Sequence, residues 1–383
     1  MRIQQLILNA IFFSLVILVF TLDAFEGLSI LSFVTAFLYL LLYFVFSRRI
    51  IFSKDLIIPI SFCLFNFASL LWGGDIFSTI NVTSAILIGC VVSLGLRTII
   101  NLPVVLWGIA ISAVINIAFS YQSIKFLQRT NEIRVGGLLG NPNGLAIFLS
   151  LSAFLIYFLS SKRTVLIKGF VFFLLFFVIF YTGSRKGLLL VGLISLIIYF
   201  EYLLRRKSKI RSFRILTIIT ISVILLGIFS QKFGSYLKDT TTIQRAETLA
   251  RGEDKWSAPI RHLMINRGVE LWYEKPIFGW GGGGFTINSG FFTYAHNNYV
   301  ELLADYGLIG FFLYYAYYIY LFVCGWRLRK KYLPRVGMAI VGMFFILELG
   351  LVSLGSKTSW IFIGVAAYCI FLPPKRLILK DHL

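Results

Sequence analysis

The sequence predicts an all-α polytopic membrane protein with about twelve transmembrane helices and one long external loop. Of its 383 residues, 58% are hydrophobic and only 14% are charged, a composition that soluble domains rarely have. Apolar runs of roughly 18 or more residues recur along the whole chain, and a helix of that length crosses a bilayer. The short loops between these runs alternate between basic and non-basic, as expected for a chain that crosses a membrane repeatedly.

The apolar runs define the predicted spans and the organisation of the chain. The first run is too long for a signal-peptide core and lacks a small-residue cleavage site, so we expect it to be retained. Residues 1–231 hold nine spans, 232–297 form the external loop with short helices, and 298–383 hold three more spans and a cytoplasmic tail. In chain order the spans are 6–22, 28–46, 56–72, 80–96, 103–120, 138–160, 166–182, 187–204, 214–231, 298–323, 335–354 and 357–372.

The basic residues predict the topology. The loops near 48–54, 97, 162–168, 205–214 and 327–335 are basic, as are the flanks of both termini, and the positive-inside rule places them all in the cytoplasm. The net charge of +20 is then a topology signal and a contact with lipid headgroups. No basic stretch is interleaved with aromatics in a soluble segment, so we expect the partner to be the lipid bilayer and no nucleic acid.

Several basic residues fall on the predicted external side, against this bias. Eight lie in the loop 232–297, and the others are Lys125, Arg129, Arg134, Arg185, Lys186 and Lys357. A solvated loop surface and an anionic substrate both explain them. Arg185 borders two apolar spans, where a charge is costly unless it is paired or functional, so we favour a function for it. We expect Lys186 and Arg134 to contribute to substrate binding.

The external loop contains a predicted helix and a glycine run. Ser257 and Pro259 suit a helix start, and the helix would run from about 259 to 274, with Arg267 and Leu271 on one face. Leu263 and Leu271 would anchor it while Arg267 points to the site. The run 279–284, which includes Trp280, cannot be regular helix. It would form a hinge or tight turn, or bind phosphate through its backbone N–H groups, and we favour the hinge or tight turn over phosphate binding.

Two further segments carry candidate site residues. Pro142 breaks the start of the sixth span, and Asn141 and Asn143 beside it would cap freed backbone groups or contact sugar hydroxyls. His296 lies at the outer mouth of the span 298–323, where a structural role competes with that of a base that takes a proton from a hydroxyl. His262 and His382 lack such a context. The four cysteines lack metal-ligand spacing.

Three spaced motifs make the chain resemble the O-antigen ligase/polymerase superfamily of bacterial envelope glycan assembly. Its two Arg-x-x-x-Leu elements correspond to Arg185/Leu189 and Arg267/Leu271, and its His-x(10)-Gly element to His296 and Gly307. The segment Asn141-Pro142-Asn143 is also similar to the group. The resemblance covers essentially the whole chain, including the long external loop before the third-last span.

The resemblance implies a metal-independent, inverting membrane glycosyltransferase that uses undecaprenyl-diphosphate-linked oligosaccharide repeats and needs no cofactor. Arg185 and Arg267 would bind the leaving diphosphate, because a guanidinium stays charged and binds phosphate oxygens bidentately. His296 would deprotonate the acceptor hydroxyl. Asn297, Tyr299, Trp280 and Tyr294 would contact sugar rings. The protein would lie in the bacterial plasma (inner) membrane, with both termini cytoplasmic and the active site facing the periplasm or outside.

The motifs leave the reaction open within this class. A polymerase joins a growing chain to another lipid-linked repeat, whereas a ligase moves the finished glycan to lipid A–core or another acceptor. We favour the polymerase, because repeated basic external loops suit two diphosphate-linked substrates. A transporter of lipid-linked glycan is the alternative from another class. It predicts ionisable residues at mid-membrane, whereas here Glu348 is the main internal exception. The sequence does not decide whether a chain-length regulator is a partner.

Overall fold

The computed structural model describes residues 2–23, 25, 27–47, 53–98, 100–127, 135–160, 164–204 and 257–371. Within these ranges the chain forms helices joined by turns, without a β-strand. Every predicted span in these ranges coincides with a helix. The span predicted at 214–231 and residues 232–256 of the external loop lie outside the described residues, so the total of twelve spans stays a prediction.

The chain divides into two compact units. One unit combines residues 1–111 with 255–383, and the other comprises residues 112–254. The helices of the first unit are α1 (Arg2–Thr21), α2 (Ser29–Ser47), α3 (Ile57–Ala68), α4 (Ile76–Thr98), the first part of α5 (Leu102–Leu127), α12 (Ser257–Glu274), α13 (Gly284–Asn288), α14 (Asn298–Arg327), α15 (Tyr332–Leu347) and α16 (Lys357–Phe371). Short 3₁₀ helices, Lys54–Leu56 and Ser69–Trp72, flank α3.

Seven of the helical segments in the described ranges are long and apolar enough to cross a membrane. Three further apolar helical segments are shorter, namely Val165–Ile179, Tyr332–Leu347 and Lys357–Phe371. Large apolar side chains are exposed along α2, for example Ile30, Phe37 and Leu41, which are 60%, 62% and 49% exposed. A surface of this kind suits lipid rather than water. The fold is therefore that of a polytopic helical membrane protein.

Helices α4 and α16 pack closely in the first unit. Gly89 on α4 lies against α16, and a Cβ added to it would come within 2.7 Å of the Trp360 carbonyl oxygen. Small residues at such crossings let helix backbones approach, which is how helices associate within lipid. At the start of α16, the Lys357 ammonium pairs with Asp23 at 2.6 Å and donates to the Ser29 carbonyl at 2.8 Å. This ion pair gives Lys357 a structural reason for lying on the predicted external side.

Helix α15 ends earlier than the span predicted at 335–354. It stops at Leu347, and the chain then turns before α16 begins. Asn298, at the start of α14, fixes this turn, since its side-chain oxygen accepts from the backbone N–H groups of Ser353 and Leu354 at 3.1 and 3.2 Å. Hydropathy did not predict this turn, because the backbone N–H groups of the turn are satisfied by a side chain of another helix.

The second unit contains the rest of α5, a 3₁₀ turn (Gly137–Leu139), α6 (Pro142–Leu159), α7 (Val165–Tyr181) and α8 (Arg185–Leu204). Helix α6 is buried along most of its length and packs on both α7 and α8. Gly187 near the start of α8 permits this packing, because an added Cβ would come within 2.7 Å of the Ala146 side chain on α6.

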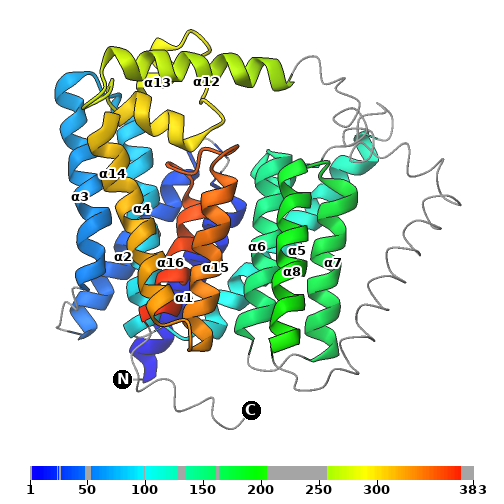
Figure 1. The fold of residues 1–383 in the computed structure, drawn as a ribbon. Coiled ribbons are helices and arrows are strands. Elements are labelled where there is room, and N and C mark those ends of the chain that lie inside the picture. The colour runs from blue at the N-terminus through cyan, green and yellow to red at the C-terminus, as the bar shows by residue number, and fades with distance from the viewer. Residues whose placement is uncertain are drawn as a thin grey trace, which may run out of the picture. The chain divides into compact units, whose positions relative to one another are not determined.

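The loop helix predicted at about 259–274 is confirmed as α12. Together with α13 it lies across the ends of α3 and α14 (Figure 1). Leu271 is fully buried in a small core that joins α12, α13 and α14. Leu263 is 58% exposed, so the prediction that it anchors α12 to the protein is wrong, and the anchor is Leu271. The buried members of this core are Met264, Leu271, Phe285, Ala295, Val300 and Ala304.

Candidate functional site at the amino-terminal end of α14

Gly307 opens helix α14 two turns after it begins. Its backbone has φ 61° and ψ −163°, which is not helical and is strongly disfavoured for residues with a Cβ. An added Cβ would also collide with the Ile277 carbonyl. The break frees backbone groups that the segment before α13 then satisfies. Leu308 and Ile309 donate to the carbonyls of Pro276 and Ile277, and Trp280 and Gly281 donate to those of Ala304 and Asp305. The glycine of the His-x(10)-Gly element thus has a structural explanation.

The glycine run 279–284 wraps the carboxylate of Asp305. Gly283 N–H donates to Oδ2 at 3.1 Å and Phe285 N–H donates to Oδ1 at 2.6 Å. Gly282 N–H donates to the Ser69 hydroxyl at 3.1 Å. These N–H groups are therefore occupied by the protein itself, and the run forms a tight turn, one of the two forms that we favoured over a phosphate cradle.

His296 sits in a strained loop directly before α14. Its φ is +57°, a left-handed conformation that is uncommon outside glycine. Such strain persists only where the surroundings impose it, and it clusters at functional sites. On one side of His296, the Ala295 N–H donates to the Glu301 carboxylate. On the other, the Asn297 side chain caps α14 by accepting from Tyr299 and Val300 N–H at 3.0 and 3.2 Å. The half-buried imidazole lies edge-on to the Tyr294 ring, with 4.3 Å between centroids.

Arg267 lies on the flank of α12, and its side chain is 35% exposed. Its guanidinium donates to Glu270 at 3.0 Å and to the Asn288 carbonyl at 3.3 Å, and Glu274 lies 3.6 Å away. Both carboxylates are well exposed, and exposed pairs of this kind contribute only about 0–1 kcal/mol. An anionic ligand can therefore replace them at little cost. Arg267 and His296 both belong to the first unit.

Arg185 is the first residue of α8 and belongs to the second unit. Ser184 before it caps the helix by accepting from Gly187 N–H at 3.2 Å, and donates to the Asn143 side-chain oxygen at 2.8 Å. Asn141 in turn caps α6 by accepting from Asn143 N–H at 2.9 Å. The motif Asn141-Pro142-Asn143 therefore builds the support on which half-buried Arg185 and Lys186 are placed.

The remaining predicted site residues have structural contacts, and their predicted sugar contacts stay predictions. The Tyr299 hydroxyl donates to the Phe345 carbonyl at 2.8 Å, and its ring stacks on that of Tyr315 at 4.8 Å. The Trp280 indole donates to the Leu271 carbonyl at 3.0 Å, and the Lys275 ammonium lies 3.7 Å above its ring. Arg134 lies outside the described residues.

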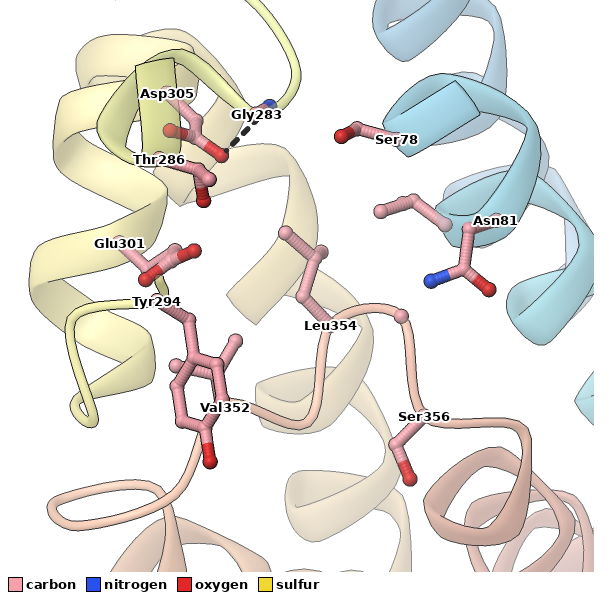
Figure 2. A pocket seen from close by; sticks show the side chains of 12 residues that line it. Ser78, Asn81, Gly283, Thr286, Tyr294, Glu301, Asp305, Val352, Leu354 and Ser356 are labelled. Atoms are coloured by element: carbon pink, nitrogen blue, oxygen red, sulfur yellow. Dashed lines mark hydrogen bonds between the residues drawn. The ribbon is translucent and has the colours of Figure 1, made fainter. Parts of the chain in front are cut away.

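A pocket of about 320 Å³ lies beside this loop in the first unit. Figure 2 shows Glu301 and Asp305 on one side of it, Ser78 and Asn81 of α4 across from them, and the turn 352–356 below. Tyr294 is also part of the wall, so the pocket and His296 share a neighbour.

The sequence did not predict this pocket, whose two carboxylates, Glu301 and Asp305, lie on α14. Two acids one turn apart at the head of an apolar span are themselves a functional signal that could have been used. The contributions of Ser78 and of the turn 352–356 had no such signal, because they come from distant parts of the chain.

The fold and this region define a membrane-embedded, polytopic helical protein with a buried polar site at the ends of its helices. Residues 170–315 match the family model described as O-Antigen ligase, a range that includes Arg185, Arg267, His296 and Gly307. This match supports the resemblance to the O-antigen ligase/polymerase superfamily that the motifs predict. A comparison with curated proteins gave no match.

Proposed function

We propose that the protein is an inverting membrane glycosyltransferase that polymerises undecaprenyl-diphosphate-linked oligosaccharide repeats into O-antigen or a related surface polysaccharide. The observation that carries the proposal is the family match over 170–315, which contains both arginine elements and the histidine element. The strained, pinned loop that presents His296 supports it independently, since the backbone around this residue is held in place from both sides.

The proposed reaction is a single displacement at an anomeric carbon. His296 accepts the proton of an acceptor hydroxyl, and the oxygen attacks the anomeric carbon of the donor sugar in line. The bond between that carbon and the diphosphate breaks, and the undecaprenyl diphosphate leaves with the electron pair. Arg185 and Arg267 stabilise the charge that develops on the departing oxygen. The proposal therefore assigns charge neutralisation to two guanidiniums rather than to a metal ion.

The proposed setting is the bacterial plasma membrane, with both termini in the cytoplasm and the site facing outward. Positive-inside loops support this orientation. Within the first unit, the amino terminus of α1 lies at one end of the helices, and α12 and α13 lie at the other end (Figure 1). If the amino terminus is cytoplasmic, α12 and α13 are then external.

Reconstitution tests the proposal. Purified full-length protein in liposomes is supplied with one lipid-linked repeat unit and no other acceptor, and the products are separated on a gel. The proposal predicts a ladder of lipid-linked oligomers. Absence of any glycosyl transfer by folded protein, together with flux of unchanged lipid-linked glycan across the vesicle, would contradict it and favour the transporter.

A ligase that transfers the finished polysaccharide to lipid A–core or another acceptor is the second candidate. The description of the matching family model as O-Antigen ligase favours it. It predicts no ladder from the repeat unit alone, and transfer once lipid A–core is added. The same reconstitution therefore separates the two reactions.

A further inference from the structure

The pocket beside His296 has a chemical character opposite to that of the arginine elements. Its walls are formed by side chains from α4, α13 and α14 and by the loops before α14 and before α16. The twelve described residues that line it include two carboxylates and no lysine, arginine or histidine. The lining therefore offers a diphosphate no cationic partner.

Glu301 is the lining residue that most clearly indicates a ligand. It is only 5% exposed, and one of its oxygens accepts the Ala295 N–H. The side chain lines the pocket beside Asp305 (Figure 2). A carboxylate that faces a pocket can accept further hydrogen bonds from a ligand that brings donors.

The other polar and aromatic groups suit the same kind of ligand. Ser78, Asn81 and Thr286 supply hydroxyl and amide groups that can both donate and accept. Tyr294 supplies a ring that lies against His296. Hydroxyl donors, amide partners and an aromatic wall together match a sugar ring, and the volume of about 320 Å³ is in the range of small-molecule sites.

We infer that this pocket binds an uncharged sugar ring of the acceptor glycan, with Glu301 accepting hydrogen bonds from its hydroxyls. The inference rests on the proposed function and names the acceptor class of that site. The other hydroxyls of this sugar ring would then lie beside Tyr294 and close to His296. Acidic sugars such as uronates are rejected, because their carboxylate would face Glu301 and Asp305.

Binding to the full-length protein in nanodiscs tests this without turnover. The probes are the methyl glycosides of glucose, galactose and N-acetylglucosamine, and the methyl glycosides of glucuronate and galacturonate, each followed by saturation-transfer NMR. At least one neutral glycoside is expected to bind about tenfold or more tightly than the uronates, and pyrophosphate is expected not to displace it. The absence of binding by all three neutral probes, or equal binding of a neutral glycoside and its uronate, would overturn the inference.

Two variants locate the binding. Glu301→Gln keeps an oxygen for the Ala295 N–H but removes the charge, and should weaken neutral-sugar binding about tenfold while narrowing the gap to the uronates. Thr286→Phe fills the pocket and should abolish binding. Asp75→Asn is the control, because asparagine caps a helix as well as aspartate and Asp75 is not among the lining residues. Thermal unfolding confirms that each variant is folded.

The outcomes separate this inference from the proposed function. Unchanged binding in both Glu301→Gln and Thr286→Phe would overturn the pocket assignment and leave glycosyl transfer standing. Sugar binding that is lost in both variants would support the pocket, even if the reconstituted protein were to transfer no sugar and the proposed function failed.

Discussion

Two buried glutamates near the amino-terminal end of α14 differ in how their oxygens are satisfied. Glu348 is fully buried, and it accepts from the Tyr315 hydroxyl at 2.8 Å, from Tyr314 at 3.4 Å and from the Ser353 hydroxyl. Glu301 is nearly as buried, but it accepts the Ala295 N–H and lines a pocket. Burial therefore does not distinguish the site from the scaffold. The number of hydrogen-bond donors around each carboxylate distinguishes the glutamate of the site from that of the scaffold.

This contrast divides the amino-terminal end of α14 into an open side and a closed side. The open side comprises His296, Glu301 and the pocket, and it has polar groups available to a ligand. The closed side comprises Asn298, Tyr315 and Glu348, whose polar groups satisfy one another. Changes on the open side should reduce turnover and spare stability, whereas changes on the closed side should do the reverse.

The largest expected effect is the loss of the proposed base. His296→Ala should lower the rate of glycosyl transfer about 10²–10⁴-fold, the usual contribution of general base catalysis. The folded fraction, measured by thermal unfolding, should stay close to that of the wild type. His262→Ala is the matched control, since His262 is exposed on α12. A rate above one-tenth of wild type in His296→Ala would remove this residue from the chemistry.

The two arginines of the proposed mechanism should act together on the diphosphate. Arg185→Ala and Arg267→Ala should each lower the rate about 10²–10³-fold, as the loss of one charge-stabilising donor does elsewhere. The double variant should be little worse than either single variant, because each arginine needs the other to hold the diphosphate. Arg329→Ala, at an exposed position, is the control. If the rate loss of the double variant equalled the product of the two single losses, the two arginines would not share one ligand.

Gly307→Ala tests the helix break that supports the open side. The backbone conformation and the collision with Ile277 should together lower the free energy of unfolding by about 4 kcal/mol. Thermal unfolding in detergent measures this loss. Gly342→Ala on α15 is the control, because the Phe322 ring, its nearest neighbour, would lie 3.9 Å from the new Cβ. Equal stability of the two variants would refute the account of the break.

Hydropathy and helix signals predicted the spans in the described ranges and the helix α12, because a membrane helix satisfies its own backbone and local residues decide where it begins. The same reasoning missed the turn after Leu347, which depends on Asn298 from another helix. It named His296 and both arginines from their spacing. It could not assemble the pocket, whose walls meet only when α4 and the turn 352–356 pack around α14.

On the closed side, Glu348→Ala should lower the free energy of unfolding by about 3 kcal/mol, because it leaves buried hydroxyl groups of Tyr315 and Ser353 without their acceptor. The transfer rate per folded molecule should remain near that of the wild type. Glu348→Gln, which keeps one acceptor oxygen, should lose less. A selective loss of rate at wild-type stability would instead place Glu348 in the reaction.

The smallest expected effect is on Asn297, whose side chain caps α14 between the open side and the closed side. Asn297→Ala should cost about 1 kcal/mol of stability, and Asn297→Ser should restore most of it, since serine also caps helices. Chemical denaturation of the three proteins measures the difference. If Asn297→Ser were stable but inactive, the predicted sugar contact of Asn297 would be supported over a purely capping role.

The most direct test of the account compares the open and closed sides in one assay. Wild type, His296→Ala and Glu348→Gln are reconstituted with the lipid-linked repeat unit, with lipid A–core present and absent, and transfer is expressed per folded molecule. The account predicts that Glu348→Gln retains near-wild-type transfer while His296→Ala loses it by about two orders of magnitude or more. Equal transfer by wild type and His296→Ala would contradict it.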